Sequence, residues 1–351
     1  MHVQNLLVGQ GISGTFLCHE LQKAGQSVLV IDEPRPFTAS RIASGIINPV
    51  TGRRLVKTWM IDELLPFLFK SYTELGSELG ISCIEQKDVI DFFPSPQMRL
   101  AFLNRLEEDG QYLSLQKDAL NWHDHLRYDF DYGIIHPCYL IDVVKLTETF
   151  RKKLIEDSLL LEEVFDAALL LVEESITYKD ITAERIIFCD GNAGAGNSYF
   201  KNLPFAPNKG EVLIVQIEDL PRTHILKKGL NLVPWKEDLF WAGSSYEWQF
   251  EHEQPTEIFR QKTTDQLHSF LKLPFTVVDH LASIRPATLE RRPFVGFHPL
   301  HPAVGIFNGM GTKGCSLAPY FAAQLAQHIA TGAPLSAEVN VKRFRRVLSR
   351  G

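Results

Sequence analysis

Residues 3–14, VQNLLVGQGISG, form the stretch that decides the fold. An apolar run ends at Val8, glycines follow in the spacing GxGxxG, and apolar residues then recur with the period of a helix. Residues 27–31 are typical of a second buried strand, which ends on Asp32. Strand, glycine turn, helix, second strand and terminal acid in this order predict a dinucleotide-binding βαβ unit.

The glycines and the acid each suit one part of a bound dinucleotide. Gly9 permits a tight turn, Gly11 lets the backbone approach the pyrophosphate, and Gly14 allows the helix to pack closely on the strand. The helix N-terminus offers N–H groups and a partial positive charge to the phosphates. Asp32 is placed to accept hydrogen bonds from a ribose, and an acid here favours FAD or NAD over NADP.

The totals of the chain indicate an ordinary globular protein. Its 351 residues, 45% hydrophobic and 22% charged, favour two domains that can be interleaved. The formal charge of −6 leaves no basic footprint for nucleic acid. No apolar stretch is long enough to span a bilayer and no signal peptide is evident, so we expect a cytoplasmic protein with no membrane partner. The scattered cysteines predict reduced thiols, and the histidine spacing predicts no metal site.

The segment after Asp32 favours FAD over NAD. Residues 38–49, TASRIASGIINP, form a small, hydroxyl-rich loop directly after the second strand. This loop resembles the segment that wraps the FAD pyrophosphate in the D-amino-acid oxidase/glycine oxidase (DAO) family. Further segments are similar to that family in the same order, namely residues 185–191, 207–212, 241–247, 283–296 and 308–314.

The resemblance implies an α/β fold (α+β overall), with a discontinuous Rossmann-type FAD-binding domain and a second, largely antiparallel β-sheet substrate domain. The expected FAD-binding domain comprises residues 1–75, 140–205 and 280–351, and the substrate domain comprises residues 76–139 and 206–279. Apolar periodicity agrees, because it predicts strands at 209–217 and 238–245 and helices at 142–155 and 257–271.

The resemblance also assigns the residues that would hold the cofactor. Some relatives attach flavin covalently through histidine or cysteine, but Arg41 and Arg285 stand at the matching positions, so non-covalent FAD is expected. The predicted FAD contacts are Gly9, Gly11, Ile12, Ser13, Gly14, Asp32, Ser40, Ser44, Gly45, Ile46, Gly191, Gly309, Gly311, Thr312 and Gly314.

Three residues are the catalytic candidates. Arg285 matches the arginine that binds the substrate carboxylate in the family, and a guanidinium suits a carboxylate because it donates two parallel hydrogen bonds. Lys313 precedes the last predicted helix, beside N–H groups that would stabilise negative charge on reduced flavin. Tyr246, with Trp248, is expected to wall the substrate pocket. Purely structural roles for all of them stay open at this point.

The predicted function is oxidation of the C–N bond of an amino acid or secondary amine, with glycine, sarcosine or a D-amino acid as small-molecule candidates. Residues 309–319 resemble most closely the FAD domain of the bifunctional tRNA 5-methylaminomethyl-2-thiouridine biosynthesis proteins. The same chemistry on a carboxymethylaminomethyl-uridine of tRNA is therefore an alternative, which the net negative charge disfavours. A non-catalytic flavin-binding protein and an NAD-dependent dehydrogenase are alternatives of other kinds.

Overall fold

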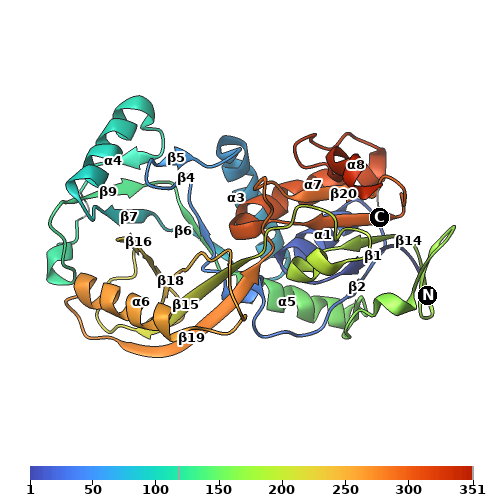
Figure 1. The fold of residues 1–351 in the computed structure, drawn as a ribbon, viewed down its shortest axis with the longest axis horizontal. Helices are drawn as coiled ribbons and strands as arrows, with labels where there is room; N and C mark the ends of the chain where they lie inside the picture. The colour runs from blue at the N-terminus through green and yellow to red at the C-terminus, as the bar shows by residue number, and fades with distance from the viewer. Residues whose placement is uncertain (118, 350–351) are drawn as a thin grey trace.

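The computed structural model describes residues 1–117 and 119–349, and it is built around two large β-sheets. The sheets lie at opposite ends of the molecule in Figure 1, and both marked termini lie at the end that holds the first sheet. The chain passes between the two sheets repeatedly, because each sheet takes its strands from segments far apart in the sequence.

The first sheet holds the predicted βαβ unit at its centre. β1 (His2–Val8) lies between β2 (Val28–Ile31) and β14 (Ile181–Phe188), and all three strands are parallel. Every residue of β2 is buried, as expected for a strand covered on both faces. The other strands of this sheet are β11 (Leu160–Leu161), β12 (Leu170–Val172), β13 (Ile176–Tyr178), β20 (Phe294–Phe297) and β21 (Val304–Asn308).

Helices cover the first sheet and bury its apolar side chains. α1 (Ile12–Lys23) packs against α7 (Gly314–Thr331), and α7 packs in turn against α3 (Ile61–Glu78). α5 (Val143–Glu156) lies beside α1. The short α8 (Arg345–Leu348) lies close to the end of the chain, near β20 (Figure 1).

The second sheet is antiparallel except where β16 meets β7, and its strand order is β19-β15-β18-β17-β16-β7-β9-β8. Its strands are β7 (Val89–Phe92), β8 (Leu113–Ser114), β9 (Tyr132–Ile135), β15 (Asn208–Gln216), β16 (Ile225–Lys227), β17 (Asn231–Pro234), β18 (Leu239–Gly243) and β19 (Thr276–Arg285).

Successive side chains of these strands point alternately to the two faces of the second sheet. Leu213 and Phe240 point to the outer face, where Leu267 of α6 (Glu257–Phe270) joins them in a buried core. Val212 and Trp241 point to the inner face and join the core that includes the helices of the first sheet. The inner face of the second sheet is therefore turned towards the region where a cofactor would bind.

Smaller elements connect the two sheets. Segments that join strands of one large sheet to strands of the other form a three-stranded sheet, β3-β10-β6, and a hairpin of β4 and β5. α4 lies at the far end of the second sheet (Figure 1). These elements are α2 (Ala39–Ile42), β3 (Ile46–Ile47), β4 (Val50–Thr51), β5 (Val56–Lys57), β6 (Ile84–Gln86), α4 (Pro96–Asp109) and β10 (Tyr139–Ile141). Short 3-10 turns lie at Trp122–Asp124, Ala167–Leu169, Gly191–Gly196, Gly311–Lys313 and Val341–Phe344.

The predicted α/β fold class, with a Rossmann-type sheet and a second, largely antiparallel sheet, is confirmed. The helices expected at 142–155 and 257–271 are α5 and α6. The strand expected at 238–245 is β18, which ends at Gly243, although Ser245 and Glu247 still form backbone hydrogen bonds with β15. All strands of each large sheet fall within the segments expected for one domain, except that β19 crosses residue 280; the domain boundaries themselves stay a prediction.

Among residues 1–117 and 119–349, no helix combines the length and the apolar character needed to cross a bilayer.

Candidate active site

A cavity of about 790 Å³ lies where the first turn of α1, the loop after β2 and the inner face of the second sheet meet. The start of α7 and the end of β14 also line it. All the predicted FAD contacts line this cavity except Gly14 and Gly309, which are buried beside it. Of the three catalytic candidates, Arg285 lines the cavity and Tyr246 and Lys313 do not.

Two glycines at the turn after β1 leave no room for a side chain of their own. Gly9 has φ +100°, and a Cβ atom there would lie 2.6 Å from the carbonyl oxygen of Cys189, directly after β14. A Cβ atom on Gly14 would lie 1.9 Å from the carbonyl oxygen of Gly9. The backbone of α1 therefore starts directly on the turn, which lets a phosphate approach its N–H groups closely.

Ser40 faces this helix N-terminus from the loop after β2. Its Oγ accepts a hydrogen bond from the backbone N–H of Ile12 at 3.0 Å. Thr38 caps the short α2 by accepting from the N–H of Arg41, which orients Ser40 in the first turn of α2. The Ser40 hydroxyl keeps its own proton, so it can donate to an oxygen of a phosphate bound there.

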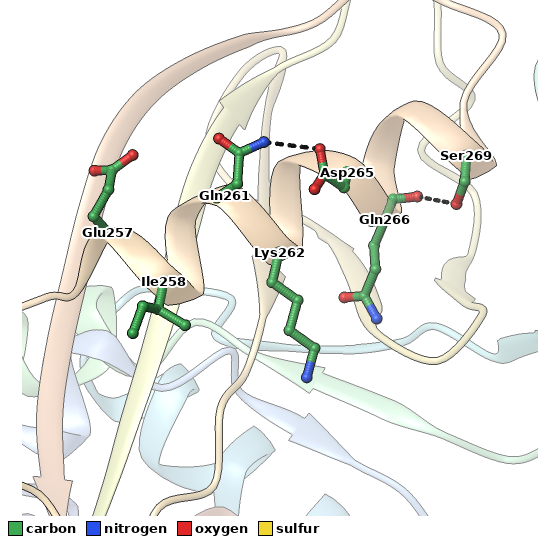
Figure 2. Close-up of a pocket in the computed structure, with 7 residues that line it drawn as sticks. All are labelled: Glu257, Ile258, Gln261, Lys262, Asp265, Gln266 and Ser269. Atoms are coloured by element: carbon green, nitrogen blue, oxygen red, sulfur yellow. Dashed lines mark hydrogen bonds between the residues drawn. The ribbon is translucent and has the colours of Figure 1, made fainter.

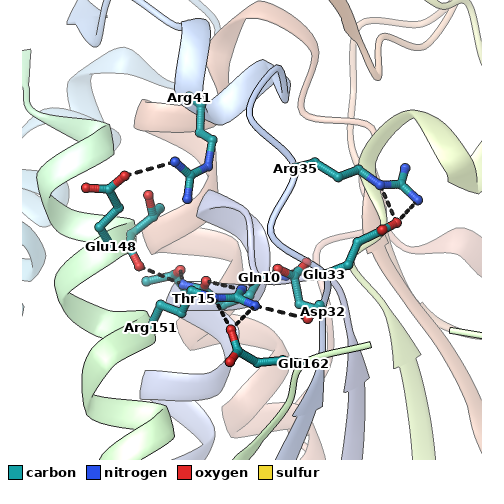
Figure 3. Close-up of polar contacts among 10 residues, drawn as sticks. Gln10, Thr15, Asp32, Glu33, Arg35, Arg41, Glu148, Arg151 and Glu162 are labelled. Carbon is teal, nitrogen blue, oxygen red and sulfur yellow. Dashed lines mark hydrogen bonds and ion pairs between the residues drawn. The ribbon is translucent and has the colours of Figure 1, made fainter. Parts of the chain in front are cut away.

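A buried arginine holds the acid at the end of β2, as Figure 3 shows. Asp32 accepts from the N–H of Gln10 at 2.9 Å and from Arg151 of α5 at 2.6 Å, and Arg151 also pairs with Glu162 at 2.9 Å. Arg151 was not among the residues predicted from the sequence. Its only signal was an arginine at a position that the helical period of residues 142–155 places on the buried face.

The same figure shows a second ion pair near the loop, between Arg41 and Glu148 of α5 at 2.9 Å (Figure 3). Arg41 also lines the cavity. This contact ties the pyrophosphate loop to α5, so the loop is held on both sides.

An acid lies at the end of β14, beside Gly191. Burial raises the pKa of Asp190 to about 6, and Asn308 of β21 donates a hydrogen bond to its carboxyl group at 2.9 Å. Asn308 also donates to the carbonyl of Gly191 at 2.8 Å. The two strand ends are therefore joined where the cavity meets the first sheet.

Arg285 reaches from the end of β19 across β15. A Cβ atom on Gly210 would lie 1.9 Å from its guanidinium, so only glycine leaves room for this arginine. The guanidinium donates to Asn208 Oδ1 at 2.7 Å, to Ser244 Oγ at 2.8 Å and to the Ser245 carbonyl at 3.2 Å. All of these acceptors are neutral, and burial lowers the pKa of Arg285.

Lys313 is not among the residues that line the cavity. Its ammonium donates to Thr58 Oγ1 at 3.0 Å, and burial, together with the positive charges of Arg291 and Arg292, lowers its pKa to about 8. Thr312 lines the cavity and Lys313 does not. The predicted catalytic role of Lys313 stays a prediction.

Tyr246 lies beside the cavity, with 47% of its surface exposed. Its ring meets that of Trp248 edge to face at 5.2 Å, and the Arg285 guanidinium lies 5.7 Å from its centroid. Tyr246 is not among the residues that line the cavity, although Ser245 and Glu247 on either side of it hydrogen-bond to the backbone of β15.

Known proteins share this architecture. A family model described as DAO, FAD dependent oxidoreductase, matches residues 6–328. The chain belongs to this family. The DAO-family assignment makes the protein an FAD-dependent oxidoreductase, and it confirms the resemblance seen in the sequence.

Solved structures agree with the DAO-family fold. Glycine oxidase from Geobacillus kaustophilus superposes with a TM-score of 0.79 at 16% identity, over 97% of this chain and 99% of that one. Iminodiacetate oxidase from Chelativorans sp. BNC1 gives 0.76 at 17% identity, over 95% and 97%. L-α-glycerophosphate oxidase from Mycoplasma pneumoniae, with FAD bound, gives 0.71 at 14% identity, over 96% of each chain.

The residues of this DAO-family chain suit FAD. The side-chain-free turn at Gly9, the Ser40 hydroxyl over the N-terminus of α1 and the acid at Asp32 occur together in one cavity. These are the features that bind the pyrophosphate and the ribose of a dinucleotide. Both an iminodiacetate oxidase and a glycerophosphate oxidase have this fold. The fold alone therefore does not decide which bond of a substrate is oxidised.

The part of the chain that the structure describes holds no group of three His, Cys, Asp or Glu side chains placed to bind a metal ion. A second hollow lies over the outer face of α6, where Figure 2 shows Glu257, Gln261 and Lys262 along the exposed side of the helix. Ile258 there is 83% exposed, so this hollow is open surface. We therefore assign no function to it.

Proposed function

We propose that the protein oxidises the C–N bond of an amino acid or secondary amine of the glycine, sarcosine or D-amino-acid type. Further support for an amine comes from two of the similar structures, which are oxidases of glycine and of iminodiacetate. We also propose that the segments carrying the first sheet form the FAD-binding domain, and that those carrying the second sheet form the substrate domain.

The observation that carries this proposal is the set of groups to which Arg285 is bonded. Within residues 1–117 and 119–349 this half-buried guanidinium forms no ion pair, and its hydrogen bonds go to neutral oxygens. A cation that is partly removed from water is costly unless an anion accompanies it. Because Arg285 lines the cavity, the carboxylate of an amino acid is the anion that would complete the site.

Arg285 would orient the substrate and leave the chemistry to the cofactor. The substrate carbon next to nitrogen gives up a hydride, which FAD accepts when bound, and the nitrogen lone pair forms the C=N bond. The resulting iminium loses a proton, and water adds to the imine to give a carbonyl compound and an amine or ammonia. The apolar side chains of Val212 and Trp241 line the same cavity and limit its water content.

Tyr246 and Lys313 would act through other groups. Tyr246 stacks beside Arg285, so it would help to fix the guanidinium. Lys313 contacts Thr58, which in turn donates to the carbonyl of Asn48 at 3.2 Å, and Asn48 lines the cavity. We therefore propose positioning roles for both residues.

An anaerobic titration of the FAD-loaded protein tests the proposed function. Glycine, sarcosine, iminodiacetate, D-alanine and D-proline are added while the visible flavin absorption is followed. We expect bleaching by at least one of them, with half-saturation shifted about a hundredfold upwards in Arg285→Met. Arg260→Met, a change on the surface of α6, is the matched control and should bleach like the unchanged protein.

Other outcomes separate the alternatives. Bleaching only by tRNA that carries carboxymethylaminomethyl-uridine would move the function to RNA modification. Bound flavin that dithionite reduces but no amine bleaches would favour a non-catalytic flavoprotein. Bleaching that is equal in Arg285→Met and in the unchanged protein would remove the carboxylate site from the proposal.

A further inference from the structure

The inner face of the second sheet carries a second cation besides Arg285. Lys227 ends β16 and lines the same cavity. Strand register places Lys227 opposite Asn231, Asn231 opposite Gly243, and Gly243 opposite Val212, and paired residues of neighbouring strands point to the same face. Lys227 and Asn231 therefore project into the cavity on the side of the sheet that also holds Arg285.

The donors of this pair are only partly used. Asp91 of β7 accepts from the Lys227 ammonium at 2.8 Å, and an ammonium has three N–H donors. The Asn231 side chain makes no hydrogen bond with any described residue, although the residue lines the cavity. Among the acids at or beside the cavity, Asp91 is held by Lys227, and Glu211 is held by Lys209 and His280. Glu253 also lines the cavity, but it is exposed and forms no ion pair with a described residue. Two neighbouring groups thus offer N–H donors to the cavity.

Lys228, the next residue along the chain, differs from Lys227 in the direction of its side chain. Lys228 points to the outer face, where it donates to the carbonyl of Arg127 and lies 5.4 Å from the centroid of the Phe270 ring. It does not line the cavity. Only one of the two adjacent lysines is therefore directed at the substrate space.

We propose that Lys227 and Asn231 form a second anion-binding subsite, so that the substrate is an amine with a second carboxylate far from the reacting carbon. This inference rests on the proposed function, in which Arg285 binds the first carboxylate. A charged donor forms a stronger hydrogen bond with an anionic acceptor than with a neutral one. A carboxylate of the ligand therefore suits Lys227 better than a neutral amide does.

The sheet sets the distance between the two anionic groups. The Arg285 guanidinium lies over Gly210 of β15, and β18 and β17 separate β15 from β16. Strands lie about 4.8 Å apart, and the register places Lys227 level with Val212, two residues along β15 from Gly210, so the backbone positions beneath the two cations are about 16 Å apart. A substrate that reaches both is much longer than glycine or iminodiacetate.

Unreactive acids test the subsite in the FAD-loaded protein. Succinate, adipate, suberate and sebacate are titrated against the flavin absorption, together with octanoate as a monoacid and suberamic acid as a neutral-ended match. We expect one of the longer diacids to bind about tenfold more tightly than octanoate and suberamic acid. In Lys227→Met that advantage should disappear while the octanoate affinity stays the same; Lys228→Met should retain it.

Lys227→Met leaves Asp91 buried without its partner and can fail to fold, so Asp91→Leu/Lys227→Met provides a second variant that removes both charges. A diacid advantage that persists in either variant, or suberamic acid binding as tightly as suberate, would overturn the subsite. Octanoate binding without any diacid advantage would overturn the subsite alone and leave the proposed function standing. No response of the flavin to any of these acids, octanoate included, would overturn both.

Discussion

Asn208 holds Arg285 through a hydrogen bond of 2.7 Å between its Oδ1 atom and the guanidinium, and it adds no charge. Asn208 is fully buried at the start of β15, and its Nδ2 atom has no hydrogen-bond partner in the described chain. The side chain therefore serves Arg285 as a neutral acceptor. The cation is oriented and its charge remains available to a ligand.

Replacing this neutral acceptor by a carboxylate tests that relationship. Asn208→Asp places a counter-ion against Arg285, so we expect the KM of the best amine substrate to rise at least about tenfold. Asn208→Leu removes the hydrogen bond and leaves the charge free, so its KM should rise only a few-fold. Steady-state kinetics of the three proteins provide the comparison. A KM in Asn208→Asp equal to that of Asn208→Leu would show that the charge of Arg285 is not used.

The glycine turn should tolerate no side chain. Gly14→Ala places a Cβ atom 1.9 Å from the Gly9 carbonyl, so the helix must move away from the turn. We expect the free energy of unfolding to fall by about 1–3 kcal/mol and the flavin content after purification to fall with it. Gly196→Ala is the control, because nothing lies within 4 Å of its added atom. Normal flavin content in Gly14→Ala would contradict the close approach.

Arg151 and Asp32 should act as a unit in binding FAD. Removing the cation in Arg151→Met leaves the carboxylates of Asp32 and Glu162 without the guanidinium that they share. We expect weaker FAD binding to the apoprotein, and a coupling energy of about 1–3 kcal/mol in a double-mutant cycle with Asp32→Asn. Isothermal titration of FAD into the four apoproteins measures it. Strictly additive losses would show that the pair is not needed to position the acid.

Lys313 should make stability depend on alkaline pH. Its folded pKa of about 8 lies below the value of about 10.4 expected in the unfolded chain. Between these values the unfolded state binds the extra proton, so the free energy of unfolding rises as the pH rises through this window. The gain should reach about 2 kcal/mol after allowance for solvent screening.

Urea unfolding of the unchanged protein and of Lys313→Met, at about pH 7 and about pH 10, measures that gain. Other groups titrate in both proteins, so their difference isolates the lysine. The change in unfolding free energy between the two pH values should be about 2 kcal/mol larger in the unchanged protein than in Lys313→Met. An equal rise in both proteins would mean that Lys313 keeps an ordinary pKa in the fold.

The sequence by itself determined the βαβ unit, the FAD cofactor and the DAO family. These depend on short-range order: Gly9 to Gly14 and Asp32 lie within one supersecondary unit, whose local geometry follows from glycine spacing and apolar period. The loop at Ser40 follows directly, so its place over α1 was also predictable.

Only the tertiary structure decided which side chains meet in the cavity. Arg151 reaches Asp32 across 119 positions of sequence, and Lys227 lines the same cavity as Arg285 only because the strand order and register put both on one face of the second sheet. The contacts of Lys313 with Thr58 and of Tyr246 with Arg285 also appear only in the folded chain, where neither residue lines the cavity. Long-range pairing and strand register are set by packing of the whole chain, and no local pattern encodes them.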